Sequence, residues 1–176
     1  MKSLLAIVLV AIISVPALSV EKAGTFALGF NNSKAPVGIR YFMNDKVGID
    51  AGLGFESKDL GDENGTSFFF EGGLTYVVFD YEKAFFFARP SLGFSSLDNR
   101  VYGSGPSDEK WTVMDIALNL GGEVRLADQF GLTFMHGLVL TSTSIPDEVA
   151  GGGETSLSDF NTFGENVTEA GVWFTF

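Results

Sequence analysis

Few residues in this chain have the side chains that enzymes most often use for catalysis. The sequence contains one histidine, His136, and no cysteine, so it offers no thiol nucleophile and no thiolate metal ligand. A histidine works as a general base only beside a nucleophile or an acid within its reach. His136 is followed by Gly137 and Leu138, and no matching motif surrounds it. We therefore expect a non-catalytic protein.

Carboxylates and arginines recur among apolar residues through the middle of the chain, and they could be mistaken for a paired acid–base site. An uncompensated charge is costly to bury, so charges in a narrow interior are expected to pair. We interpret these residues as an ion-pair network that fills the lumen of the fold. The predicted network comprises Arg40, Asp50, Glu56, Glu71, Arg89, Asp115, Glu123, Arg125 and Glu169.

A second group of acids lies in polar segments and could bind divalent cations. Asp62-x-Asn64-Gly65 partly matches a calcium-binding loop, but Leu60 stands where the first ligand belongs. Asn64-Gly65 is also a common turn sequence. We predict that these loop charges are solvated and that the chain has no metal site and no cofactor. Binding of divalent cations by the surface loops is the alternative.

The elements that must position these residues are strands. From Gly24 onward, apolar and other residues alternate with a period of two, and turn residues interrupt the alternation at intervals. Eight strands are predicted, at 24–31, 37–43, 47–57, 67–79, 84–96, 111–125, 131–141 and 166–176.

The connections between these runs alternate in length. Three are tight turns, at 44–46, 80–83 and 126–129. The others are longer and polar, which is typical of the extracellular loops of outer-membrane barrels. The predicted surface loops are 58–66, 97–110 and 142–165, with 32–36 as the shortest of the set.

The two faces of the predicted strands differ in charge. One face, represented by Leu28, Ile39 and Leu118, carries no Asp, Glu, Lys or Arg, whereas the network above lies entirely on the other. A charge at the bilayer midplane costs about 2–4 kcal/mol, so a lipid-facing surface excludes it. Small residues suit a cramped lumen. The glycines on the charged face include Gly29, Gly38, Gly48, Gly52, Gly54, Gly73, Gly93, Gly121, Gly137 and Gly171.

This pattern predicts an all-β fold, an eight-stranded antiparallel up-and-down transmembrane β-barrel. A soluble up-and-down barrel is the competing interpretation. It would place the glycine-rich face in water, where glycine weakens a strand, and it would overfill the lumen with large apolar side chains.

The N-terminus has the pattern of a secretory signal peptide at 1–19. Lys2 provides the positive charge, Leu4–Ile13 the apolar stretch and Ala17-Leu18-Ser19 the small residues at a cleavage site. Residues 20–176 are then the barrel domain, placed in the bacterial outer membrane. The net charge of −11 argues against nucleic acid as a partner.

The last residues resemble the C-terminal signal of bacterial outer-membrane proteins, in which apolar residues alternate up to a terminal Phe. Val172, Phe174 and Phe176 match that pattern, and Ala170 matches more weakly. Strand number and topology further resemble the small-barrel superfamily of the OmpA membrane domain and OmpX. The resemblance implies recognition by the barrel assembly machinery and by periplasmic chaperones. Lipid A deacylases of this barrel size use a Ser two residues after a His, which Leu138 replaces here.

The expected role is structural or surface-interacting: envelope integrity, adhesion, or an accessory subunit of a larger outer-membrane complex. Its other expected partner is outer-membrane lipid. Transport of small hydrophobic molecules through the wall is the alternative, followed by a lipid-modifying enzyme. Three local predictions accompany this role. Arg40 should pair with Asp50, Pro90 should cause a bulge or a missing bond, and the strand ending at Phe176 should pair with 24–31.

Overall fold

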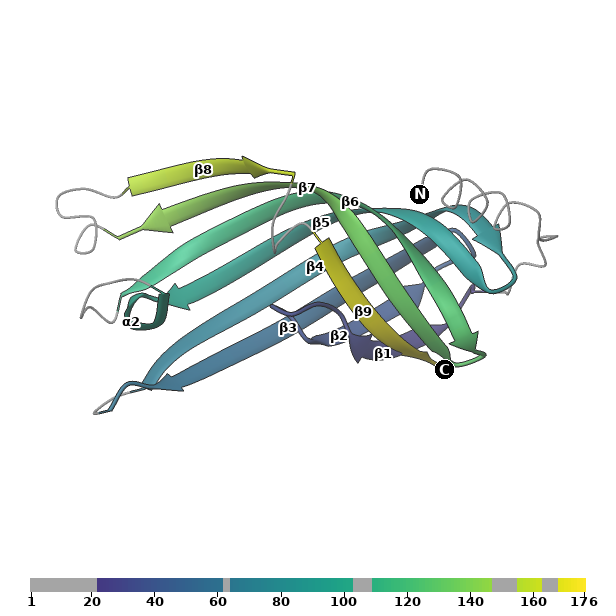
Figure 1. Ribbon diagram of the computed structural model, residues 1–176, viewed down its shortest axis with the longest axis horizontal. Helices are drawn as coiled ribbons and strands as arrows, with labels where there is room; N and C mark the ends of the chain where they lie inside the picture. Colours follow the sequence, from purple (N-terminus) through teal and green to yellow (C-terminus); the bar gives the residue numbers. More distant parts are fainter. Residues whose placement is uncertain (1–21, 62–63, 103–108, 147–154, 163–167) are drawn as a thin grey trace, which may run out of the picture.

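The computed structural model describes residues 22–61, 64–102, 109–146, 155–162 and 168–176, and the predicted signal peptide at 1–19 lies outside them. These residues form an all-β fold with one short helix (Figure 1). The elements are β1 (Phe26–Phe30), β2 (Val37–Phe42), β3 (Val47–Asp59), β4 (Asn64–Tyr81), β5 (Ala84–Asp98), α2 (Asn99–Tyr102), β6 (Lys110–Ala127), β7 (Phe130–Ile145), β8 (Thr155–Asn161) and β9 (Thr168–Thr175).

The nine strands form one antiparallel sheet that closes on itself. The strand order is β6-β5-β4-β3-β2-β1-β9-β7-β8, and a further pairing of β6 with β7 completes a ring. β9 and β8 share one edge of β7, since β9 pairs with Phe130–His136 and β8 with Val139–Ile145. The closed circuit therefore runs through β1 to β7 and β9, and we call this part the ring.

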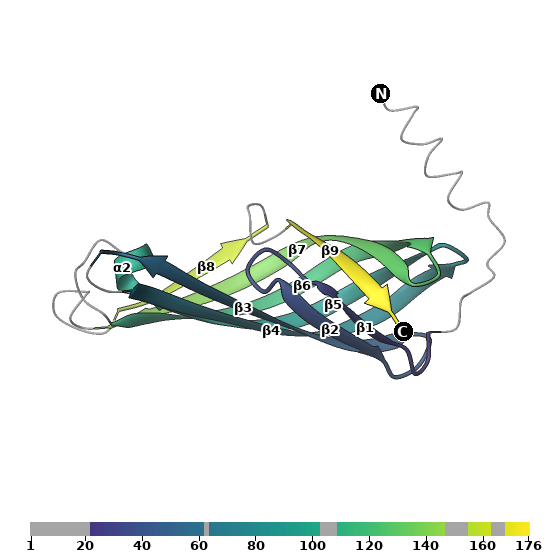
Figure 2. The same ribbon diagram turned by 90° about the horizontal axis from the view of Figure 1, so that it is seen from below.

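The sheet continues beyond the ring as an open, curved layer. β2 pairs with β3 only up to Leu53, and within the described residues β3 then has β4 as its sole partner, up to Asp59. β8 likewise pairs only with β7 in the described part of the chain. The far ends of β3 to β7, together with β8, thus project past the ring (Figure 2), and we call this part the extension.

The strand count and several strand ends differ from the prediction. The ninth strand, β8, lies inside 142–165, which the sequence had suggested to be a loop, and β7 itself runs to Ile145. The expected loops 58–66 and 97–110 are shorter for the same reason, because β3, β4, β5 and β6 extend into them. In these stretches the strands remain paired although their outward residues are no longer apolar.

The parity of the two faces agrees with the prediction. Outward residues such as Val37, Leu118 and Phe134 are exposed apolar side chains, whereas Arg40 and Arg89 are almost completely buried inside the ring. Within the described residues, no helix is long and apolar enough to cross a membrane.

The interior of the ring near the tight turns is apolar, which the sequence analysis did not anticipate. Phe42, Val77, Phe85, Phe87 and Met135 form one buried cluster. The Phe42 and Phe85 rings meet edge to face with centroids 5.9 Å apart, a favourable aromatic geometry. This cluster closes the ring at its turn end.

The strand that contains Pro90 keeps its register. Toward β6, Pro90 lies opposite Leu118 in an unbroken ladder. Toward β4, the ladder skips the two positions 89–90 and then resumes in the same register, so the missing bonds expected from a proline occur on one side only. The register shifts lie elsewhere, in β4 between Val77 and Phe79 and in β6 between Arg125 and Ala127.

Candidate functional site

The first layer of charge inside the ring joins β2 to β6 across the lumen. Nη1 of Arg40 donates to Oε2 of Glu123 over 2.6 Å, and Oγ1 of Thr133 donates to the same oxygen over 3.0 Å. The guanidinium lies 4.1 Å from the ring centroid of Trp173, which adds a cation–π contact.

The predicted pairing of Arg40 with Asp50 is correct for backbone register but wrong for the ion pair. The two residues lie directly opposite each other on β2 and β3. An arginine side chain is long enough to cross a narrow lumen, and Arg40 reaches Glu123 instead. Asp50 is engaged by Arg89 and Thr75.

Arg89 is the centre of a second charged layer. Its Nε and Nη2 donate to Oδ1 of Asp50 over 2.9 and 2.5 Å, and its Nη1 donates to Glu71. Thr75 Oγ1 donates to the other Asp50 oxygen over 2.9 Å. A Cβ at Gly73 would lie 2.6 Å from the guanidinium, so glycine makes the space that Arg89 occupies. Charged hydrogen bonds of this kind are strong where water is excluded.

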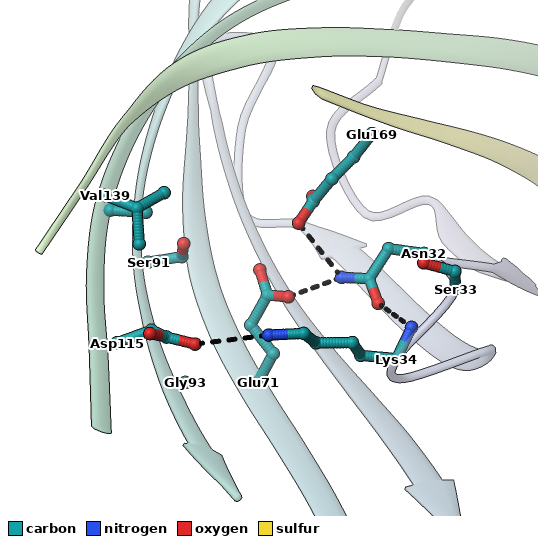
Figure 3. A pocket seen from close by; sticks show the side chains of 10 residues that line it. Asn32, Ser33, Lys34, Glu71, Ser91, Gly93, Asp115, Val139 and Glu169 are labelled. Carbon is teal, nitrogen blue, oxygen red and sulfur yellow. Dashed lines mark hydrogen bonds and ion pairs between the residues drawn. The ribbon is translucent and has the colours of Figure 1, made fainter. Parts of the chain in front are cut away.

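The β1–β2 connection folds into the ring and forms a third layer (Figure 3). Oδ1 of Asn32 accepts the backbone N–H groups of Lys34 and Ala35 over 3.0 and 2.7 Å. Its Nδ2 donates to Glu71 over 2.5 Å and to Glu169 over 3.4 Å. The prediction that 32–36 is a surface loop is therefore wrong.

Two glycines on β3 allow this inward fold. A Cβ at Gly54 would lie 1.8 Å from the carbonyl oxygen of Lys34, and one at Gly52 would lie 3.0 Å from the Ala35 side chain. The run of lumen-facing glycines on β3 was the signal in the sequence that another segment packs against that strand.

Lys34 and Asp115 complete the third layer. The Lys34 Nζ lies 3.7 Å from Oδ2 of Asp115, and Thr141 Oγ1 donates to Oδ1 of Asp115 over 2.6 Å. Glu71 and Glu169 flank a polar cavity of about 40 Å³ beside them. Ordered water can fit there, since one molecule needs about 10–15 Å³ of such space. In the described part of the chain, no three His, Cys, Asp or Glu side chains are arranged to hold a metal ion.

Two residues of the predicted network lie apart from it. Glu56 is in the extension, where it accepts a hydrogen bond from the Tyr102 hydroxyl of α2. Burial, with the hydrogen bond and charge of Glu56, raises the pKa of Tyr102 to about 12. Arg125 is at the turn end of β6, where its backbone N–H bonds to the carbonyl of Lys83 over 2.7 Å.

A lysine that the sequence analysis missed lies against the aromatic cluster at the turn end of the lumen. Lys22 is 1% exposed, and its ammonium group bonds to Asp80 and lies 5.2 Å from the ring centroid of Phe85. Its backbone N–H donates to Oδ1 of Asp45 over 2.8 Å, and that of Ala23 over 3.1 Å. These two backbone bonds hold the pKa of Asp45 below its ordinary value.

A larger, half-open cavity of about 550 Å³ lies above the charged layers, inside the extension. Phe69, Leu97 and Val113 form its apolar wall on β4, β5 and β6. Lys34, Glu56 and Tyr102 are also among the residues that line it. The arrangement can enclose a small molecule.

His136 has a neighbour that the sequence did not indicate. Its Nδ1 lies 2.8 Å from Oγ1 of Thr168 on the outer face, where β7 and β9 pair. A nucleophilic hydroxyl needs a base that is itself oriented by a third group. The adjacent carboxylate, Glu169, turns into the lumen toward Asn32 (Figure 3). The contact therefore gives two polar atoms a partner on an apolar surface.

The residues of the predicted assembly signal lie on β9 and just beyond it. β9 pairs antiparallel with β1, as predicted, with Leu28 opposite Phe174 and Phe30 opposite Val172. The Phe176 N–H donates to the carbonyl of Phe26 over 2.8 Å, so the ladder continues to the last residue. Phe174 and Phe176 are exposed on the outer surface.

Comparison of the chain with models of protein families, with curated proteins and with solved structures gave no significant match.

Proposed function

We propose that this chain is an integral outer-membrane protein. Its ring of eight strands spans the bilayer as a plugged β-barrel, and its extension stands outside as a surface for interaction. The observation that carries the proposal is the outer surface of the ring, where exposed apolar side chains follow every strand. Soluble proteins rarely expose contiguous apolar patches larger than a few hundred Å². Examples on successive strands are Leu28, Ile39, Ile49, Leu74, Leu92, Leu118, Leu138 and Phe174.

The change of outward residues along the longer strands supports this placement. On β3, the apolar series ends at Phe55 and is followed by Ser57, and on β5 it ends at Phe94 and is followed by Ser96. β4 and β6 each have 18 residues, whereas a membrane-spanning strand needs about 9–11. The excess length corresponds to the extension, which fits a part that lies in water.

The interior supports a structural role over that of a channel. The salt bridges of Arg40 and Arg89 and the aromatic cluster around Phe85 lie one after another inside the ring. Narrow barrels of this strand number are filled by side chains. In our proposal the tight turns and both termini face the periplasm, and the extension contacts the outside, either alone or within a larger complex.

Membrane assembly and conductance test this proposal. The chain expressed with its N-terminal segment should fractionate with outer membranes. It should also migrate faster on a denaturing gel before boiling than after, as folded barrels do. Purified and reconstituted into planar bilayers, it should give no steady ion conductance. A protein that stays soluble in the periplasm, or one that forms a stable open pore, would contradict the proposal.

A further inference from the structure

The half-open cavity of the extension lies beside a gap in the wall of the sheet. In the described residues, the edge of β3 from Gly54 onward has no strand partner on the β2 side, because that pairing stops at Leu53. On the far side of the gap stands β8, whose described partner is β7 alone. The apolar outer surface extends into this gap, since Phe55 on β3 is 71% exposed and Phe160 on β8 is 61% exposed.

One residue connects the outer surface with the cavity. Phe55 belongs to the outward apolar series of β3, and it is also one of the residues that line the cavity. Behind it, Phe69, Leu97 and Val113 give the cavity an apolar back wall. In the proposed placement the bilayer ends near Phe55, where the apolar series of β3 ends, so an alkyl chain can pass from the bilayer surface into the cavity while it stays in contact with apolar side chains.

The charges around the cavity already have partners. Lys34 lies 3.7 Å from Asp115, and Glu56 accepts a hydrogen bond from Tyr102. The lining contains one base and one acid, Lys34 and Glu56, so no excess of positive charge is present to attract a carboxylate or a phosphate. A hydroxyl or an ester needs no such charge, and it can bond to Ser33 or Ser95, which line the cavity.

We infer that this cavity binds a single-chain, uncharged amphiphile, such as a long-chain alcohol or a monoacylglycerol, which enters through the gap between β3 and β8. The inference rests on the proposed membrane placement and names the ligand class of the extension. The volume of about 550 Å³ lies within the usual range of small-molecule sites, about 300–1,000 Å³. The charged layers beneath the cavity close the way to the periplasm, so the site is one of binding rather than of passage.

The chain carries its own reporter for this site. It has two tryptophans. Leu97 and Val113 both line the cavity. Trp111 lies opposite Leu97 in the β5–β6 ladder and is on the same face of β6 as Val113. Trp173 is buried against Arg40 in the ring. A brominated alkyl chain in the cavity should therefore quench Trp111 and leave Trp173 unchanged.

The experiment uses the full protein folded in phosphatidylcholine vesicles and titrated with a brominated long-chain alcohol. We expect saturable quenching of tryptophan fluorescence. Trp111→Phe should remove it, and Ser95→Phe, which fills the cavity from a buried position, should abolish the saturable part. Ser142→Phe is the matched control, because Ser142 is exposed on the opposite face of the same sheet. A brominated fatty acid of equal length, kept ionised, should quench less.

Two comparisons separate the outcomes. Brominated phosphatidylcholine in the vesicle should give no saturable quenching, which distinguishes the bound ligand from bulk lipid. The inference would be overturned, and the proposed function kept, if the protein gave the folded, heat-modifiable band but wild type and Ser95→Phe were quenched equally. Stronger quenching by the brominated fatty acid than by the brominated alcohol would have the same consequence. Failure to form that band in vesicles would overturn the proposed function and the inference with it.

Discussion

The ring and the extension are built from the same strands, yet their two faces are opposite in character. In the ring, β3 to β7 show apolar residues outside and layers of ion pairs inside, above the aromatic cluster at the turn end. In the extension they show Ser57, Ser96 and Ser142 outside and a cavity with an apolar back wall inside. The backbone ladder continues through the change without a break in β6. Backbone pairing therefore keeps a strand regular along its whole length. The types of side chain on each face change with the environment of that part of the strand.

The largest expected effect is in the interior of the ring. Arg89→Met leaves Asp50 and Glu71 buried without their cation, and breaking a buried pair in this way costs about 3–5 kcal/mol. The urea midpoint of the folded band in vesicles should fall sharply. The triple variant with Asp50→Asn and Glu71→Gln should recover much of the loss, since it removes the stranded charges. Additive losses would show that Arg89 does not balance these acids.

A charge on the outer face distinguishes the two regions directly. Leu118→Arg places a cation in the middle of the proposed lipid-facing surface, and it should lower the free energy of unfolding by about 2–4 kcal/mol. Ser142→Arg, on the neighbouring strand in the extension, should change it by less than about 0.5 kcal/mol. Equal effects at both positions in a urea titration would mean that the outer face has one environment throughout.

Acid should loosen the extension near α2. Hydrogen bonds from the Arg100 side chain, and to a smaller extent backbone N–H groups of Arg100 and Thr66, lower the pKa of Asp98 to about 2 from 3.8 despite its burial. Because the pKa of Asp98 is lower in the folded than in the unfolded state, the ionised carboxylate stabilises the fold at pH values above its unfolded-state pKa. This stabilisation is lost as the pH falls through the folded-state pKa. Between about pH 4 and pH 2, protease cleavage near α2 should increase in wild type.

Asp98→Asn is the control for this pH dependence. The variant should be cut near α2 at neutral pH and should show little further change on acidification, because the titrating carboxylate is gone. An acid response that persists unchanged in Asp98→Asn would assign the loosening to another group.

The smallest effect on stability is expected at the end of β9. Phe176→Ala removes one exposed aromatic ring and keeps the backbone bonds to Phe26, so the urea midpoint should move little. If the resemblance to assembly signals is correct, the folded band should nevertheless form more slowly in cells. Leu126→Ala, also an exposed apolar residue near the turn end, should leave the assembly rate unchanged. Equal assembly rates for Phe176→Ala and wild type would remove the signal role.

The face that each ring residue occupies could be predicted from the sequence. Side chains in a strand alternate between the two faces, and the charged residues of the ring all fall on one of them. The strand ends could not be predicted, because apolar alternation reports the outer environment and stops at Ser57 and Ser96 while the backbone pairing continues. β8 was missed for the same reason: Thr-Ser-Leu-Ser-Asp-Phe-Asn has no apolar face.

A charged interior could be predicted from the sequence, but two of the predicted members, Glu56 and Arg125, lie apart from it, and the individual pairs could not be predicted. Strand register predicts only which residues lie opposite each other on adjacent strands. Arg40 instead bonds to Glu123 across the lumen, and Arg89 bonds to Asp50. The inward fold of 31–36 depends on a tertiary fit to Gly52 and Gly54; the glycines on β3 indicate that a segment packs there, but not which segment.

Labelling of single cysteines on intact cells tests the central claim most directly, because the natural chain has no cysteine to interfere. The three variants are Ser142→Cys on the extension, Leu118→Cys on the outer face of the ring and Glu82→Cys in a tight turn. With a membrane-impermeant maleimide, we predict labelling of the Ser142→Cys variant alone, and labelling of the Glu82→Cys variant only after the outer membrane is broken. Equal labelling of the Leu118→Cys and Ser142→Cys variants, or labelling of the Glu82→Cys variant on intact cells, would contradict a ring that spans the bilayer beneath an external extension.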